Sequence, residues 1–153
     1  MTAAGVQLMG AVPGSASGLP AQAVLASGRL APDPPGLPLA QGEVQVWVLH
    51  AADVPACASA LVHTLSADER ARAGRYRAEV HRQRFIARRG MLRWLSARYL
   101  GCSPQALRWE VEDGGKPLWR QPAAPRLAFS VSQTECMALL AFAWDCRVGV
   151  DVQ

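Results

Sequence analysis

The sequence predicts an α+β domain over residues 43–153, in which helices pack on an antiparallel sheet. Two observations predict it. Apolar residues recur at helical spacing through the Arg-rich stretch 66–100, whereas short stretches before and after it alternate in the manner of strands. The chain has 153 residues, of which 50% are hydrophobic, so it is long enough for one domain with a core.

Residues 1–42 differ from this domain in composition and are predicted to be a disordered leader. Ala, Gly, Pro and Ser fill most of the stretch, and its only charged side chains are Arg29 and Asp33. Proline removes backbone donors, and glycine raises the entropy cost of ordering. Neither a signal-peptide pattern nor an apolar run of the ~20 residues that span a bilayer is present. We therefore expect a soluble, cytoplasmic protein with no membrane contact.

The first predicted elements of the domain are a strand and two short helices. In residues 43–50, Val alternates with other side chains, and large side chains lie on both faces. This pattern predicts a strand inside the sheet. A helix is expected over about 53–65. Ser66 and Glu69 then have the spacing of a capping box, which predicts a second helix reaching about Glu79.

A longer helix is predicted over residues 81–100, with Gly101 as its left-handed stop. Gly90 lies inside this helix, where glycine lowers stability, so it could allow close approach of a neighbouring element. One face of the helix is apolar and is expected to be buried. Its residues are Phe85, Leu92, Leu95 and Tyr99.

After Pro104 the sequence changes to short alternating stretches and turns. Residues 107–112 alternate, and Asp-Gly-Gly-Lys at 113–116 predicts a turn. Three further strands are expected over 127–132, 137–144 and 148–152. The last two are separated by three residues, so they are predicted to form a hairpin.

The cysteines indicate no zinc site. They are widely spaced, and the three histidines lie at no matching ligand spacing. We expect free, buried thiols. These residues are Cys57, Cys102, Cys136 and Cys146.

Positive charge is concentrated in the predicted helices. Ten arginines lie between Ser66 and Arg98, against Asp68, Glu69 and Glu79. They are either a solvated helical face or an anion site, because guanidinium groups bind phosphate bidentately. Composition alone leaves the two interpretations open.

Four segments, in order, carry a family resemblance. The chain resembles the N-terminal half of the Sfp-type 4′-phosphopantetheinyl transferases, whose corresponding motifs read approximately R-x-x-x-ARG-x-LR, GKP, FN-[LI]-SHS and G-[VI]-D-[IV]-E. No single motif is specific, but their common order across residues 43–153 is. The segments here are LSADERARAGRYR with HRQRFIARRGMLRWLSARYLG, then GGKPLW, LAFSVSQTECMALLAFA and VGVDVQ.

The resemblance implies one half of a two-half α+β fold and a reaction in which coenzyme A gives its phosphopantetheine arm to a serine of an acyl or peptidyl carrier protein. The released product is 3′,5′-ADP. The implied coenzyme A-binding residues are cationic or polar. They are Arg72, Arg84, Lys116, Ser132 and Gln133.

Two positions depart from the family pattern. Gln133 stands where the family has His, and an amide donates to phosphate but carries no charge. Asp151 matches the first metal-binding carboxylate, while Gln153 replaces the second, so a weakened Mg²⁺ site is implied.

The C-terminal half of the family fold, with its further Glu and its Lys-Glu motif, has no counterpart here, so no complete catalytic set is expected. We expect a transferase that is incomplete as a lone chain and that pairs with a separate C-terminal half or with itself. The alternative is a non-catalytic remnant or a module that binds coenzyme A or a carrier protein. Nucleic-acid binding is disfavoured because no nucleic-acid motif accompanies the arginines.

Overall fold

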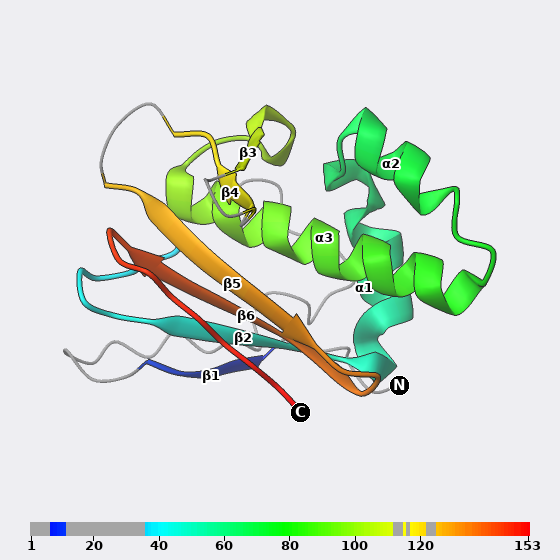
Figure 1. The fold of residues 1–153 in the computed structure, drawn as a ribbon, viewed down its shortest axis with the longest axis horizontal. Coiled ribbons are helices and arrows are strands. Elements are labelled where there is room, and N and C mark those ends of the chain that lie inside the picture. Colours follow the sequence, from blue (N-terminus) through cyan, green and yellow to red (C-terminus); the bar gives the residue numbers. More distant parts are fainter. Residues whose placement is uncertain (1–6, 12–35, 112–114, 116, 122–124) are drawn as a thin grey trace.

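An antiparallel sheet covered on one face by helices forms the domain (Figure 1). The computed structural model describes residues 7–11, 36–111, 115, 117–121 and 125–153. Within these residues lie three α-helices and six strands. The predicted α+β class, with helices on an antiparallel sheet, is confirmed.

The main sheet has four strands in the order β1-β2-β6-β5, and each neighbouring pair is antiparallel. β5 therefore lies at one edge of the described sheet. β3 and β4 form a separate two-stranded ribbon. The strands are β1 (Gln7–Ala11), β2 (Gln45–His50), β3 (Trp109–Val111), β4 (Pro117–Trp119), β5 (Leu127–Gln133) and β6 (Met137–Trp144).

β2 lies inside the sheet, as its sequence predicts, between β1 and β6. Trp47 is buried, and its Nε1 donates a hydrogen bond of 2.9 Å to the Tyr99 hydroxyl. Tyr99 in turn donates to Gln45 Oε1 over 2.6 Å. Because buried polar groups need partners, this chain of bonds lets the long helix pack directly on the strand.

The two short helices are α1 (Val54–Leu61), flanked by 3₁₀ turns, and α2 (Ala67–Ala73). The predicted capping box at the start of α2 is confirmed. Ser66 Oγ accepts from the Glu69 amide at 3.3 Å, and Glu69 Oε2 accepts from the Ser66 amide at 2.9 Å.

The prediction that the second helix reaches Glu79 is wrong, because α2 ends at Ala73. Beyond its C-cap, Gly74, the Tyr76 amide bonds to Ala73 O over 3.3 Å, a tightening typical of a helix end. The Tyr76 ring then packs on Phe85, with ring centroids 5.5 Å apart. This contact requires the chain to turn before the next helix begins.

The long helix α3 (Glu79–Leu100) ends at Gly101, whose φ of 65° confirms the left-handed stop. Gly90 is the point where α3 meets α1: a Cβ there would lie 2.6 Å from Leu61 Cβ. The expectation of close approach at this glycine is confirmed. The predicted apolar face is buried throughout, at Phe85, Leu92, Leu95 and Tyr99.

The predicted C-terminal strand over 148–152 is absent, so the expected hairpin with β6 is wrong. The segment instead follows the edge strand β5. The Val150 amide donates to Ser130 Oγ and the Val152 amide to Ser132 Oγ, each over 3.2 Å. Because serine hydroxyls replace backbone carbonyls as acceptors, no strand ladder forms.

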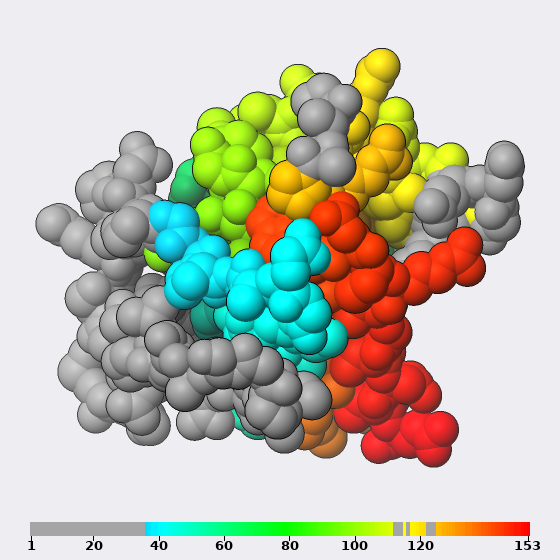
Figure 2. All heavy atoms as spheres, turned by 90° about the vertical axis from the view of Figure 1, so that its left-hand side faces the viewer, coloured from blue at the N-terminus to red at the C-terminus, as the bar shows by residue number. Residues whose placement is uncertain are grey.

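Within the range predicted as a leader, residues 1–42, the structure describes 7–11, which form β1, and 36–42. The latter segment is bonded to the domain through Trp144 Nε1, which donates to Leu39 O over 2.9 Å. Figure 2 shows this segment in cyan beside residues near the C-terminus in red. The rest of the predicted leader lies outside the described residues.

The four cysteines are free, as predicted, but only Cys57 is buried. The expectation of buried thiols is wrong for Cys102, Cys136 and Cys146, which are exposed. Each of these three lies in a turn or bend after a helix or beside a strand of the sheet, where neither helix nor sheet packing covers it.

Candidate functional site

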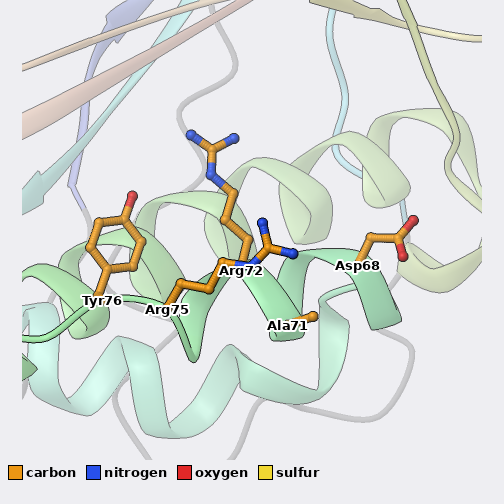
Figure 3. A pocket seen from close by; sticks show the side chains of 5 residues that line it. All are labelled: Asp68, Ala71, Arg72, Arg75 and Tyr76. Atoms are coloured by element: carbon orange, nitrogen blue, oxygen red, sulfur yellow. The ribbon is translucent and has the colours of Figure 1, made fainter.

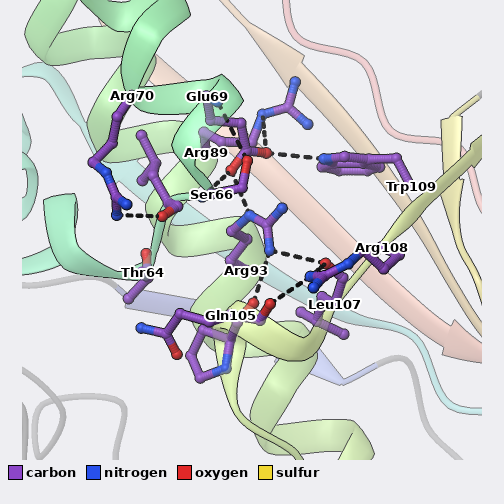
Figure 4. A network of polar contacts seen from close by, with 12 residues as sticks. Thr64, Ser66, Glu69, Arg70, Arg89, Arg93, Gln105, Leu107, Arg108 and Trp109 are labelled. Carbon is purple, nitrogen blue, oxygen red and sulfur yellow. Dashed lines mark hydrogen bonds and ion pairs between the residues drawn. The ribbon is translucent and has the colours of Figure 1, made fainter.

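Arg93, one of the ten clustered arginines, belongs to the core. Its side chain is 1% exposed, and its Nε lies 2.5 Å from Glu69 Oε2. Glu69 also accepts from Trp109 Nε1 at 2.9 Å, and Arg89 Nε lies 3.6 Å from Glu69 Oε1 (Figure 4). A buried charge needs such pairing. This network therefore joins α2, α3 and β3.

The environment of Glu69 fixes its charge. Burial acts to raise the pKa of this carboxyl, but hydrogen bonds from Arg93, from the Ser66 amide and from Trp109 outweigh burial. The net pKa is lower than its usual value. Glu69 is thus a carboxylate that neutralises Arg93 and leaves little charge for the other arginines.

Arg72 lies near the end of α2 and is exposed. It lines an open hollow of about 630 Å³ together with Arg75 and Tyr76 (Figure 3). Its guanidinium carbon is 5.3 Å from the centre of the Phe85 ring, a cation–π distance. Phe85 therefore links the position of Arg72 to the first turns of α3.

Arg84 and Gln133, distant in sequence, are brought together. Both line a small cavity of about 20 Å³ between α3 and the β5–β6 turn. Arg84 is half-buried, and its Nη2 donates to Glu135 O over 3.2 Å, which holds the guanidinium at this turn. Gln133 ends β5 and is exposed. A cation and an amide donor thus meet at one end of the edge strand.

Ser132 and Asp151 form a second pair. Ser132 Oγ donates to Asp151 Oδ1 over 2.9 Å while it accepts from the Val152 amide. Asp151 is exposed, and its other carboxylate oxygen makes no hydrogen bond or ion pair with the described residues. The serine therefore holds one carboxylate oxygen of Asp151 and leaves the other accessible to a ligand.

The two pairs lie on opposite sides of β5. Along this strand Phe129 and Val131 pack into the core under the helices, whereas Ala128 packs with the C-terminal segment on the other face. By alternation, Gln133 shares the helix side and Ser132 the opposite side. Because β5 is an edge strand, a ligand at its end could reach both.

The predicted metal pair is represented by two exposed residues, Asp151 and Gln153. In the described part of the chain, no group of three or more His, Cys, Asp or Glu side chains could hold a metal ion. The available donors are oxygens, which suit Mg²⁺ in kind, but only one of them carries charge. Lys116, the remaining predicted phosphate ligand, lies outside the described residues.

Sequence reasoning missed a cavity of about 230 Å³ between α3 and the edge strand. Arg88 and Arg89 line it with Trp109, Phe129 and Ser130. The Arg89 guanidinium carbon lies 4.3 Å from the centre of the Trp109 ring. The Arg-Arg doublet in the middle of the helix was the available signal, but which arginines face the sheet depends on the register of α3 against β5.

No described helix is long and apolar enough to cross a membrane.

Comparison with known proteins gives two informative relatives, while no family model matches the chain. The chain is 37% identical over 123 residues to the 4′-phosphopantetheinyl transferase HetI of Nostoc sp.. That alignment covers 80% of this chain and 52% of HetI. It is 36% identical over 91 residues to slr0495 of Synechocystis sp., whose name gives the same activity provisionally. This second alignment covers 58% of the chain and 36% of the relative.

The chain thus spans about half the length of the first of these relatives. The aligned length is long enough, and the identity high enough, to indicate common ancestry rather than a shared short motif. Two relatives from different organisms carry the same family name. Over its aligned part, the chain is therefore related to proteins named 4′-phosphopantetheinyl transferases.

Proposed function

We propose that this chain takes part in moving the 4′-phosphopantetheine arm of coenzyme A to a serine of an acyl or peptidyl carrier protein. The observation that carries the proposal is the meeting of two polar pairs at the end of β5. Arg84 and Gln133 line one cavity, and Ser132 holds Asp151. The relationship to proteins named 4′-phosphopantetheinyl transferases supports this choice of reaction.

On the helix side of β5, the chemistry suits a phosphate ester. Arg84 provides a permanent charge and a planar set of donors that match phosphate oxygens. Gln133 can add an amide N–H at the same cavity. Arg72, beside its open hollow, offers a further cation for the nucleotide end of coenzyme A. We propose that these residues bind and orient the phosphates.

On the opposite side, Asp151 would hold Mg²⁺ with help from the Gln153 amide oxygen. A metal there would neutralise charge on the pyrophosphate. The single carboxylate predicts weak metal binding, because an amide oxygen adds no negative charge. Ser132 contributes by fixing one oxygen of Asp151.

The proposed transfer is a phosphoryl-type substitution. The serine oxygen of the carrier bonds to the phosphorus that bears the pantetheine arm, and the P–O bond to the other phosphate breaks. 3′,5′-ADP leaves with the bonding electrons, and the serine proton passes to a base. We assign that base to no residue of this chain. We propose that a C-terminal half of the family fold, or a second copy of the chain, supplies it.

The deciding test is mass spectrometry of an apo-carrier protein incubated with the chain, coenzyme A and Mg²⁺. The incubation is repeated with the C-terminal half of a relative added, and with Asp151→Asn as the matched control. A gain of one phosphopantetheine arm that Asp151→Asn abolishes supports the proposal. No gain in either incubation, beside a full-length relative that modifies the carrier, overturns it.

A non-catalytic module that binds coenzyme A is the second candidate. The glutamines at 133 and 153 favour it, because both departures remove charge from positions where the family carries it. Calorimetry separates the two candidates: heat with coenzyme A but no holo-carrier under any condition supports the module. Absence of heat at millimolar coenzyme A excludes it.

A further inference from the structure

Arg88 differs from the other arginines on its helix. Arg82 pairs with Glu79, Arg84 donates to Glu135 O, and Arg93 pairs with Glu69. Arg88 is half-buried, yet its guanidinium makes no hydrogen bond or ion pair within the described part of the chain. A cation taken partly out of water without a carboxylate costs stability.

The electrostatic surroundings of Arg88 agree with that cost. Burial is the main cause that lowers the pKa of Arg88; Tyr76 acts to raise it, and the positive charge of Arg72 lowers it further. Arg89, the next residue, also has a lowered pKa, mainly through burial. Arg89 has the Glu69 carboxylate beside it, whereas Arg88 has only neighbouring cations and Tyr76, so an anion would relieve Arg88.

The position of Arg88 explains where that anion would enter. Arg88 is one helical turn after Arg84, so the two side chains share a face of α3. It borders the small cavity that Arg84 and Gln133 line. It also borders the cavity of about 230 Å³ that Arg89, Trp109 and Ser130 line. Arg88 is the residue common to the linings of these two cavities.

We propose that Arg88 is a phosphate-binding residue that joins the two cavities into one site for a pyrophosphate-bearing ligand. Arg84 and Arg88 would hold the charged oxygens at the cavity opening. The organic part would lie in the larger cavity, which Trp109 and Phe129 also line. The ligand class deepens the proposed function and rests on it, since coenzyme A is a pyrophosphate ester. The anion site itself is tested without coenzyme A.

The direct test is calorimetric titration with sodium pyrophosphate, in chelator and at constant ionic strength. We compare the wild type, Arg88→Ala, Arg88→Lys and Arg82→Ala. The last is the matched control, because it removes one charge from an exposed part of the same helix. We expect Arg88→Ala to weaken binding by about tenfold or more, as loss of a charge-assisted bond does. Arg88→Lys should keep part of the affinity.

Thermal unfolding without anion guards against a folding defect. Because Arg88 makes no hydrogen bond or ion pair with the described residues, Arg88→Ala should unfold at a temperature no lower than the wild type. Pyrophosphate should then raise the unfolding temperature of the wild type and of Arg82→Ala, but raise that of Arg88→Ala far less. A structural arginine would give the reverse pattern, with loss of stability and no selective loss of the ligand effect.

The outcomes separate this inference from the proposed function. Selective loss of pyrophosphate binding in Arg88→Ala supports the inference even where no holo-carrier forms. It is overturned if the wild type does not bind pyrophosphate, or if Arg88→Ala and Arg82→Ala weaken binding equally. Transfer to a carrier that is unchanged in Arg88→Ala also overturns it, while the proposed function stands.

Discussion

The hydroxyl of Ser132 donates to Asp151 Oδ1 over 2.9 Å and accepts from the next backbone amide, that of Val152. One side chain thus fixes both the direction of the C-terminal segment and the carboxylate that it carries. Ser130 makes the corresponding bond to Val150 two residues earlier. The two serines, spaced as alternate residues of β5, replace the strand ladder that the sequence predicts for 148–152.

Replacing Ser132 by Ala should free the end of this segment locally. A hydrogen bond of this kind contributes about 1 kcal/mol, and two are lost together. Hydrogen exchange measured by NMR should show a faster amide at Val152, while the amide of Val150, held by Ser130, stays protected. Ser132→Thr retains the hydroxyl and serves as the control. Equal acceleration at both amides in Ser132→Ala would contradict independent anchoring.

The Glu69–Arg93 pair should make stability depend on pH. The pKa of Glu69 is lowered in the folded protein, so its stabilisation is complete above the unfolded-state pKa of about 4.3. It is lost as the pH falls further through the folded pKa. Urea unfolding should therefore show that the free energy of unfolding falls between pH 6 and pH 3. The fall should be less steep in Glu69→Gln than in the wild type.

The same substitution measures the pair itself. Glu69→Gln leaves the buried Arg93 without a carboxylate, which should cost about 3–5 kcal/mol at neutral pH. Glu79→Gln is the matched control, because its pairing with Arg82 is exposed and is expected to contribute little. If Glu79→Gln loses as much free energy of unfolding as Glu69→Gln, the change of charge alone, rather than burial of the pair, causes the effect.

Gly90→Ala tests the contact between α1 and α3. Alanine favours the helix by about 1 kcal/mol. Its Cβ, however, would lie 2.6 Å from Leu61 Cβ and 3.2 Å from Leu61 O, and overpacking of this kind costs about 1–3 kcal/mol. We expect net destabilisation in urea unfolding. Gly74→Ala, where the nearest atom is 3.5 Å away, should be close to neutral.

Local signals predicted much of the fold. The Ser66–Glu69 spacing predicted a capping box, and Gly101 predicted a helix stop, because both depend on residues adjacent along the chain. The prediction of a strand at 148–152 was wrong because any extended segment can show the same alternation of side chains. Whether the amides of such a segment donate to backbone carbonyls or to the hydroxyls of Ser130 and Ser132 depends on the tertiary structure.

The site was predictable in its residues but not in its arrangement. Motif positions named Arg84 and Gln133, and the structure brings them to one cavity. Composition could not distinguish Arg93, which forms a core ion pair, from Arg88, which forms none with the described residues. Both are helix-borne arginines, and only the packing of α3 on α2 and β5 gives them different environments.

Gln153→Glu should strengthen metal binding at Asp151. Gln153 is two residues after Asp151 and exposed, so a second carboxylate could approach the same ion without a burial cost. One added charge near a divalent ion in water contributes about 1–2 kcal/mol, or about tenfold in affinity. Mn²⁺ binding measured by electron paramagnetic resonance reports this directly, in a protein without coenzyme A. Gln105→Glu, which adds the same charge after the end of α3, should leave the affinity unchanged. Adding Asp151→Asn to Gln153→Glu should remove the gain, because the two carboxylates are expected to share one ion; a gain that survives Asp151→Asn would place the metal elsewhere.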